Sequence, residues 1–593
     1  MTRVPLRPLA RILEARSRGE NPDAIERENI RLRHEEMRDR ARQKAEGRLL
    51  VLGVLFFLAF GAVGARMGLM ASSMPEEPQA NASTSDINAS RADIVDRNGK
   101  ILATNLSTHS LYAQPPLMVD AERAARELVK IVPDLDAEIL TRQFTGERTF
   151  VWVRKVLSPE QQQQVHDLGE PGLLFGPREM RLYPNGALAA HVLGGYGFGV
   201  EDVRAAEVIG TAGIERAFDG FLRDPAENGK PLQLSLDLTV QAAVEEILDG
   251  GMRLMNAKGA AAVLMDAVTG EVIALASLPD FDPNDRPAPL TEGDQSDSPL
   301  FNRAVQGLYE LGSTFKIFAA AQAMELGIMN PATLVEADAP MVWGKYTIRE
   351  FENKNFGPTL SVTDVIVESS NVGTANIALE IGAERQQAFL ESLGLFTPSP
   401  VEVSEARSVT PLLPDRWSEI HTITISYGHG LSASPLHLAA AYGTLLNGGT
   451  KVKPTLLKKT ERVAGPRVVS EAVSEHARNM LRQVVKRGTA SFGEVPGYLV
   501  AGKTGTADKP RSTGGYYEDK VIATFASVFP ADDPKYILVV TLDEPVETSG
   551  TEPRRTAGWT AVPVAAEVIR RTAPLLGLRP EIEPATANGL TEG

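Results

Sequence analysis

Residues 49–65 constrain the chain more than any other segment, because they read LLVLGVLFFLAFGAVGA and include no charged or strongly polar side chain. These 17 residues are flanked by Arg48 and Arg66, and their length is at the lower end for a helix that crosses a membrane. A buried helix of a soluble protein normally carries one polar face. A cleavable signal peptide would not follow 48 other residues. We therefore predict an uncleaved, single-pass transmembrane helix over residues 49–66.

The distribution of charge predicts the orientation of this helix. Residues 1–48 contain 13 Arg or Lys against 9 Asp or Glu, although the whole chain has a net charge of −15. Because positively charged flanks stay on the cytoplasmic side of a membrane, the N-terminus is expected in the cytoplasm. We predict that residues 1–48 form a cytoplasmic arm and that the rest of the chain lies on the opposite side of the membrane.

Composition excludes several classes of function. A net charge of −15, with no basic patch beyond the N-terminal arm, argues against nucleic acid as a partner. The chain has no cysteine, which excludes disulfide scaffolds, thiolate metal sites and cysteine nucleophiles. Its eight histidines are scattered and form no His-Glu-x-x-His pattern. We therefore expect neither a metal site nor a cofactor.

The part after the membrane helix divides into four predicted regions: a polar linker over residues 67–90, a first domain over 91–230, a second domain over 231–575 and a flexible tail over 576–593. The first domain begins with alternating apolar residues on either side of Asn98 and Gly99, a pattern typical of a hairpin. The second has strand-like segments at both ends and helical segments between them. This order predicts an α/β domain whose two ends meet in one antiparallel sheet.

Three short motifs carry the candidate chemistry. Ser313 and Lys316 form the one Ser-x-x-Lys match in the chain, which by itself is weak, since about one or two matches are expected by chance. The one Ser-x-Asn triplet begins at Ser369, and the one Lys-Thr-Gly triplet begins at Lys503. The three motifs occur in this order, 56 and then 134 residues apart. Together they are a specific pattern.

The spacing of the first motif suits nucleophilic catalysis. On a helix, residues three apart share a face, so the Lys316 amine can take the proton of the Ser313 hydroxyl. Ser313 would also lie near the positive end of the helix dipole. A lysine acts as a base near pH 7 only if its pKa falls from about 10.4 by about 3. We expect burial and a second cation to supply that change.

The motif set resembles that of the penicillin-binding proteins and serine β-lactamases, namely Ser-x-x-Lys, Ser-x-Asn and Lys-Thr-Gly. RADIVDRNGKILATN and RLYPNGALAAHVLGGYG are similar to the non-catalytic pedestal of class B penicillin-binding proteins. GEVIALASLPDFDPN and SYGHGLSASPLHLAAAYGTLLNGG are similar to their transpeptidase domain. The Ser-Ser-Asn-Val-Gly form of the middle motif is more similar to the septal, FtsI-type enzymes than to the elongation enzymes.

This resemblance implies a role for each motif residue. Ser313 would be the nucleophile, Lys316 its base, and Ser369 a proton relay towards the leaving amine. Asn371 would hold the amide backbone of the substrate, and the oxyanion hole would be formed by the backbone N–H groups of Ser313 and Thr506. The remaining residues would line the site of the terminal carboxylate: Lys503, Thr504, Gly505 and Thr506. The family also implies that Lys503 lies across the cleft, where it would be the second cation that lowers the pKa of Lys316.

The implied activity is that of a peptidoglycan D,D-transpeptidase, which cross-links stem peptides of glycan strands through a serine acyl-enzyme and is acylated by β-lactams. The family also implies a membrane SEDS glycosyltransferase and other divisome proteins as partners. It implies a bacterial inner membrane with the catalytic domain in the periplasm, and a position at the division septum. Three alternatives stay open: an elongation-type transpeptidase, a membrane-tethered β-lactamase or carboxypeptidase, and a non-catalytic scaffold or sensor. The large pedestal-like region argues against the second, and the complete motifs argue against the third.

One residue departs from the family pattern. Leu311 stands where proline is usual, two residues before Ser313. Because proline fixes φ, its loss predicts a more adaptable turn at the start of the nucleophile helix.

Overall fold

The computed structural model describes residues 13–21, 23, 27, 31, 50–67, 91–201, 206–227, 229–511 and 514–581. The chain separates into two compact units, Met1–Gln79 and Ala80–Gly593. In the first unit, Leu50–Met67 is a helix with every described residue exposed, and it is long and apolar enough to cross a membrane. Most of the predicted arm and linker lies outside the described residues, as do residues 582–593 of the predicted tail.

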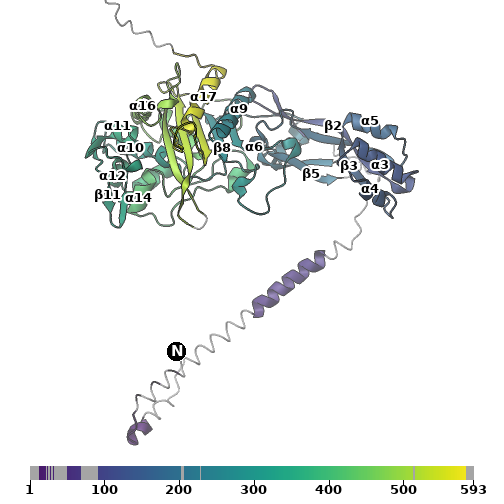
Figure 1. The fold of residues 1–593 in the computed structure, drawn as a ribbon, viewed down its shortest axis with the longest axis horizontal. Helices are drawn as coiled ribbons and strands as arrows, with labels where there is room; N and C mark the ends of the chain where they lie inside the picture. The colour runs from purple at the N-terminus through teal and green to yellow at the C-terminus, as the bar shows by residue number, and fades with distance from the viewer. Residues whose placement is uncertain are drawn as a thin grey trace, which may run out of the picture. The chain divides into compact units, whose positions relative to one another are not determined.

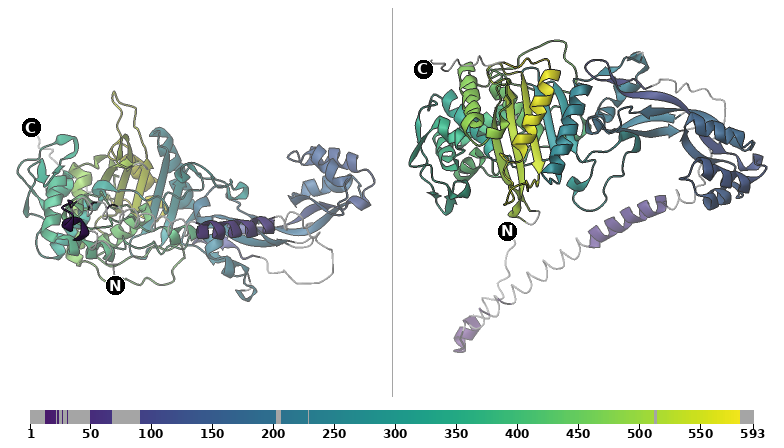
Figure 2. Two further views of the ribbon diagram at one scale, coloured as in Figure 1. Left: turned by 90° about the horizontal axis from the view of Figure 1, so that it is seen from below. Right: turned by 45° about the horizontal axis from the view of Figure 1, so that its top comes forward.

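A five-stranded antiparallel sheet forms the centre of the second unit (Figures 1 and 2). Its strands come from both ends of the predicted second domain, as the sequence indicated. β16 pairs with β8 along their whole length, from Tyr536 opposite Asp266 to Asp543 opposite Gly259. The strands in spatial order are β14 (Ala501–Pro510), β15 (Tyr516–Phe529), β16 (Tyr536–Asp543), β8 (Gly259–Asp266) and β9 (Val272–Leu278).

Helices cover this sheet because their apolar faces match its buried strands. α9 and α17 pack on each other and on the sheet, and Gly251 of α9 lies against the side chain of Val564. All twelve residues of α15 are buried, which is typical of a helix enclosed in a core. The bounds are α9 (Leu238–Leu254), α17 (Ala561–Leu575), α15 (Pro435–Leu446) and α16 (Glu471–Arg487).

A group of shorter helices lies beside the sheet and contacts α16 through α10 and α11. Most begin at a polar N-cap: the hydroxyl of Ser361 accepts from Asp364 N, and that of Ser370 accepts from Gly373 N. This group positions the first two motifs. Its members are α10 (Lys316–Glu325), α11 (Val362–Val367), α12 (Asn371–Ile381), α13 (Ala383–Ser392) and α14 (Glu419–Ser426).

The region before residue 231 is built on the long strand β2 (Ile101–Ala113). β1 (Ile94–Val95) and β2 form the antiparallel hairpin predicted around Asn98 and Gly99, and the Asp96 carboxylate accepts from the N–H groups of that turn. Other strands extend this sheet, and three helices cover its far end in a small core of their own. The bounds are β3 (Val151–Leu157), β4 (Leu173–Leu182), α3 (Ala121–Ile131), α4 (Ala137–Phe144) and α5 (Pro159–Asp167).

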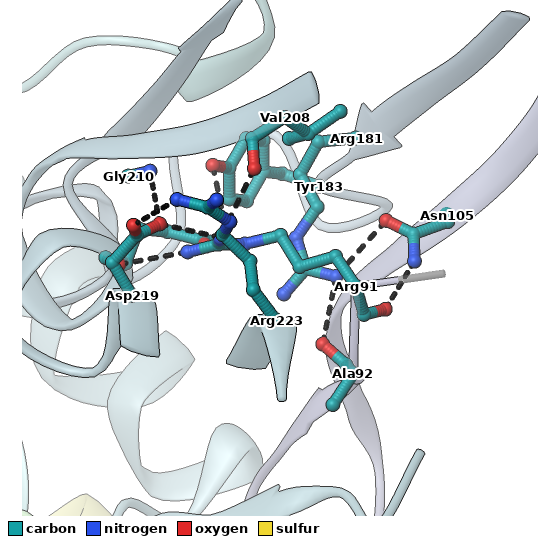
Figure 3. A network of polar contacts seen from close by, with 10 residues as sticks. Arg91, Ala92, Asn105, Arg181, Tyr183, Val208, Gly210, Asp219 and Arg223 are labelled. Carbon is teal, nitrogen blue, oxygen red and sulfur yellow. Dashed lines mark hydrogen bonds and ion pairs between the residues drawn. The ribbon is translucent and has the colours of Figure 1, made fainter. Parts of the chain in front are cut away.

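A buried ionic network ties the start of this region together (Figure 3). The Glu215 carboxylate lies 2.7 Å from the guanidinium groups of both Arg91 and Arg181, and all three side chains are at most 2% exposed. Arg91 also pairs with Asp219 at 2.6 Å. Buried charges are tolerated when they are paired in this way. The network joins β4 to α7 (Gly213–Ala217), which lie far apart in the sequence.

The main hydrophobic core continues across residue 231. It includes Ile94, Tyr183 and Ile214 from the first region together with Val263 and Phe525 of the central sheet. β7 (Leu232–Gln233), which begins the predicted second domain, pairs in parallel with β1. The two regions therefore share one core and one strand pairing at this boundary. The predicted domain boundaries stay predictions.

Candidate active site

The first motif begins on a tight 3-10 turn. Gly312–Phe315 form this turn, and α10 follows at Lys316. The sequence predicted that Ser313 and Lys316 share one α-helical face, but the 3-10 turn has three residues per turn and places side chains i and i+3 one above the other. The half-buried Ser313 therefore lies one turn before the buried Lys316.

Glycines allow this turn to touch its neighbours backbone to backbone. A Cβ on Gly505 would lie 2.2 Å from Leu311 O, and one on Gly428 would lie 2.0 Å from Gly312 O. Gly312 has a φ of 54° and donates its N–H to Gly428 O at 3.2 Å. β14 therefore lies directly beside the turn that carries Ser313, so close that only glycine fits at position 505.

Leu311 is 1% exposed and belongs to the main core. Its carbonyl accepts a hydrogen bond of 2.8 Å from the Thr314 hydroxyl. The buried Leu311 side chain thus restrains this part of the turn, at the position where proline is usual. The adaptability expected from the sequence stays a prediction.

The second motif meets Lys316. The Lys316 amine donates to Ser369 Oγ at 3.1 Å, to Asn371 Oδ1 at 2.7 Å and also to Ser369 O. Ser369 has a φ of 62°, in the left-handed region that non-glycine residues rarely adopt. This turn between α11 and α12 directs both its hydroxyl and its carbonyl towards the lysine.

The third motif completes the arrangement from β14. The fully buried Lys503 donates to Ser369 Oγ at 3.0 Å and to Thr504 O at 3.3 Å. The Ser369 hydroxyl therefore lies between the amines of Lys316 and Lys503, which are 187 positions apart in the chain. Within the described residues, no hydrogen bond joins Ser313 Oγ to Lys316 Nζ.

Burial lowers the pKa of both lysines. It lowers the pKa of Lys316 to about 7, and the negative charge of Glu350 acts in the opposite direction. Burial, and then the positive charge of Lys316, lower the pKa of Lys503 well below its usual range. The sequence predicted a lowered pKa for Lys316 from burial and from Lys503. Burial is the main cause, and the effect of the neighbouring cation falls on Lys503.

The other predicted binding residues line β14 beside the nucleophile turn. Thr504 and Thr506 share one face of the strand, because successive side chains alternate. The Thr504 hydroxyl shares a hydrogen bond of 2.7 Å with Thr489 Oγ1, and Thr506 Oγ1 accepts from Ala557 N at 3.0 Å. All eight predicted residues thus belong to segments that meet at the N-terminal end of α10.

Two carboxylates at this site were not found from the sequence. Glu350 is buried and accepts hydrogen bonds from Ser370 and from the first N–H groups of α12. Glu310 is buried three residues before the nucleophile and accepts from Gly430 N and the Tyr516 hydroxyl. Glu350 lies in no recognisable motif. For Glu310, the one indication in the sequence is its position three residues before Ser313.

Among the described residues, no group of three or more His, Cys, Asp or Glu side chains is arranged to hold a metal ion. The motif side chains that meet at the site carry hydroxyl and amine groups. A buried amine with a pKa near 7 beside a serine suits acyl transfer with the lysine as base.

Known proteins are similar to this chain over most of its length. The family model of the penicillin binding protein transpeptidase domain matches residues 260–569, and that of the penicillin-binding protein dimerisation domain matches residues 86–230. The probable peptidoglycan D,D-transpeptidase FtsI of Caulobacter vibrioides is 34% identical over 571 residues, 94% of each chain. The probable peptidoglycan D,D-transpeptidase PenA of Neisseria meningitidis is 32% identical and aligns with 85% of this chain and 87% of its own length.

Solved structures show the same fold. Penicillin binding protein 3 of Mycobacterium tuberculosis, in complex with aztreonam, superposes with a TM-score of 0.62 and 27% sequence identity. The superposition covers 83% of this chain and 98% of the other. A second structure of the same protein, in complex with ampicillin, gives a TM-score of 0.63.

Proposed function

Since this chain belongs to the FtsI-type class B penicillin-binding proteins and is a peptidoglycan D,D-transpeptidase, we propose that it cross-links stem peptides at the division septum through an acyl-enzyme on Ser313. One observation carries the proposal: the Ser369 hydroxyl accepts hydrogen bonds from both Lys316 and Lys503. Lys316 itself lies one turn after Ser313.

Acylation begins at Ser313. Its Oγ attacks the carbonyl carbon of the penultimate D-Ala of a stem pentapeptide, and the neutral amine of Lys316 takes the hydroxyl proton. A pKa of about 7 supports this role, because it leaves a large fraction of the amine neutral at physiological pH. The C–N bond to the terminal D-Ala then breaks.

Ser369 relays the proton to the departing amine. Its contacts with both lysines support this role, since a proton can pass from Lys316 through the hydroxyl without a large movement. The amino group of a neighbouring stem then attacks the ester, the Ser313–acyl bond breaks, and Ser313 regains its proton. The product is a cross-link between two glycan strands.

Substrate binding falls to the other motif residues. Asn371 holds the amide backbone of the stem, and the hydroxyls of Thr504 and Thr506 bind the terminal carboxylate beside Lys503, where Gly505 keeps the strand close. The backbone N–H groups of Ser313 and Thr506 form the oxyanion hole. The first N–H groups of a helical turn lack a partner within the helix, which supports this use of Ser313. β-Lactams acylate the same serine because they present a strained amide near a carboxylate.

The helix Leu50–Met67 anchors the enzyme in the inner membrane, with the N-terminus in the cytoplasm and the catalytic region in the periplasm. Its partners are a SEDS glycosyltransferase and other divisome proteins. Depletion of the protein tests the septal role: filamentous cells support it, and rounded cells indicate the elongation role instead.

Two experiments separate transpeptidation from the alternatives. A labelled penicillin bound to the full chain should stay attached for minutes or longer, whereas release within seconds would indicate a β-lactamase or carboxypeptidase. In a depletion strain, Ser313→Ala should fail to restore growth. Normal growth and division with Ser313→Ala would show that the protein acts as a scaffold or sensor.

A further inference from the structure

Glu350 is a buried carboxylate directly behind the second motif. One of its oxygens accepts a hydrogen bond of 2.6 Å from the Ser370 hydroxyl and one of 3.1 Å from Val372 N. The other accepts from Asn371 N at 2.6 Å. Glu350 therefore binds the N-terminus of α12, where a negative charge is favourable.

The same short segment also fixes the side chain of Asn371. Its amide nitrogen donates to Arg349 O at 2.8 Å, so its amide oxygen is turned towards Lys316, from which it accepts at 2.7 Å. Arg349 and Glu350 thus hold Asn371 by its side chain and its backbone. This contact determines which end of the amide the lysine meets.

Ser369 needs such support. A left-handed backbone is unfavourable for serine and persists where surrounding contacts hold it. The hydrogen bonds from Ser370 and Asn371 to Glu350 follow Ser369 directly in the chain. They fix the end of the turn whose hydroxyl and carbonyl accept from Lys316.

Glu350 also acts on Lys316 through its charge. Among the charged groups of the described residues, two act near Lys316: Glu350, directly before the 3-10 turn Phe351–Asn353, and Lys503 on β14. Burial lowers the pKa of Lys316, and the Glu350 charge partly offsets this effect. The charge of Glu350 therefore reaches the base as well as the start of α12.

We infer that Glu350 is a positioning residue for acyl transfer, which holds the Ser369–Asn371 turn against Lys316 and supplies the negative charge opposite that lysine. The inference rests on the proposed roles of Ser313 and Lys316. It assigns a function to a residue outside the three motifs.

The test is the pH profile of penicillin acylation by the full chain and by Glu350→Gln. Acylation needs neutral Lys316, so its rate rises with pH through the pKa of that group. Removal of the negative charge lowers this pKa, and the acid limb should move to lower pH by about one unit. The maximal rate should fall about tenfold, because the amide cannot accept every hydrogen bond that the carboxylate accepts.

Glu352→Gln is the matched control. Glu352 lies two residues further on, its side chain is 61% exposed, and it pairs with Lys354. The same chemical change there should leave both the acid limb and the maximal rate unchanged. If Glu350→Gln lowers thermal stability but keeps the acid limb of the wild type, Glu350 is a helix cap only and the inference is wrong.

Glu350→Asp keeps the inference testable if the Gln variant does not fold. The shorter side chain places the negative charge farther from Lys316, so the acid limb should move in the same direction by a smaller amount. An acid limb that does not move would overturn the inference. Ser313→Ala distinguishes this failure from failure of the proposed function. Acylation that persists in Ser313→Ala refutes the proposed nucleophile, whereas its loss together with an unmoved Glu350→Asp profile refutes only the role of Glu350.

Discussion

The amine of Lys503 lies 3.0 Å from the hydroxyl oxygen of Ser369, and the amine of Lys316 lies 3.1 Å from the same oxygen. One hydroxyl therefore connects a lysine on a helix with a lysine on a strand. A hydroxyl has two lone pairs, so it accepts from both amines and leaves its own proton for transfer. This contact links the three motifs into one site.

Ser369→Ala should remove this link while it leaves the backbone in place. We expect the rate of transpeptidation to fall by about 10²–10⁴-fold, the typical contribution of a positioned proton-transfer group. Turnover of a D-Ala-D-Ala stem peptide measures this effect. Ser408→Ala, on an exposed serine, is the control and should keep full activity. A loss of less than about threefold in Ser369→Ala would remove Ser369 from the proton path.

The rate of acylation should depend on pH with a midpoint near 7 on the acid side. Burial lowers the pKa of Lys316 to about 7, and the base must be neutral, so acylation is slow below this pH and fast above it. A stopped-flow measurement with a chromogenic penicillin between pH 5 and 9 checks this. A midpoint above about 9 would mean that Lys316 keeps its ordinary pKa and does not act as the base.

The stability of the protein should also depend on Lys316. Its folded pKa is lowered, so between about pH 7 and pH 10 the unfolded chain binds a proton that the folded chain does not, and stability rises with pH. Relative to Lys316→Met, the wild type should gain up to about 4 kcal/mol across this range. Urea unfolding at several pH values measures the difference, and parallel curves for the two proteins would contradict the expectation.

Gly428 and Gly382 offer a matched pair of substitutions. Their φ angles are 86° and 85°, so alanine is strained at both. An added Cβ meets Gly312 O at 2.0 Å in Gly428→Ala but nothing within 4 Å in Gly382→Ala. We expect Gly428→Ala to lower acylation by about 100-fold, because it displaces the turn of Ser313. Gly382→Ala should acylate normally, and equal losses in both would mean that backbone strain alone is responsible.

Glu215→Ala should destabilise the fold without contact with the active site. It leaves Arg91 and Arg181 buried without their shared carboxylate, which typically costs about 3–5 kcal/mol. Glu127→Ala removes an exposed pair with Lys130 and should cost less than about 1 kcal/mol. Thermal unfolding of the full chain compares the two variants. Similar melting temperatures would show that the buried network does not stabilise this region.

Much of the fold could be predicted because it depends on local patterns. Alternating apolar residues around Asn98 and Gly99 specified a hairpin, and strand-like segments at residues 259–278 and 501–543 specified a sheet that joins both ends of the domain. The three motifs predicted a set of candidate site residues whose segments meet in the structure. Their spacing also placed Ser313 and Lys316 one turn apart.

The remaining features depend on tertiary contacts. The 3-10 turn at Gly312 follows from its close approach to Gly428 and β14, which no local pattern encodes. The left-handed backbone of Ser369 and the burial of Glu350 depend on each other through the start of α12. Glu350 lies 19 positions before Ser369 in a segment without a motif, so the sequence alone did not indicate it.

The most direct test of the account is the site of the covalent adduct after the full chain reacts with a penicillin. The protein is digested, and the peptide that carries the added mass is identified by mass spectrometry. The account predicts one adduct, on Ser313, which is absent from Ser313→Ala and retained in Ser408→Ala. An adduct on another serine, or an unchanged adduct in Ser313→Ala, would contradict the assignment of Ser313 as the nucleophile.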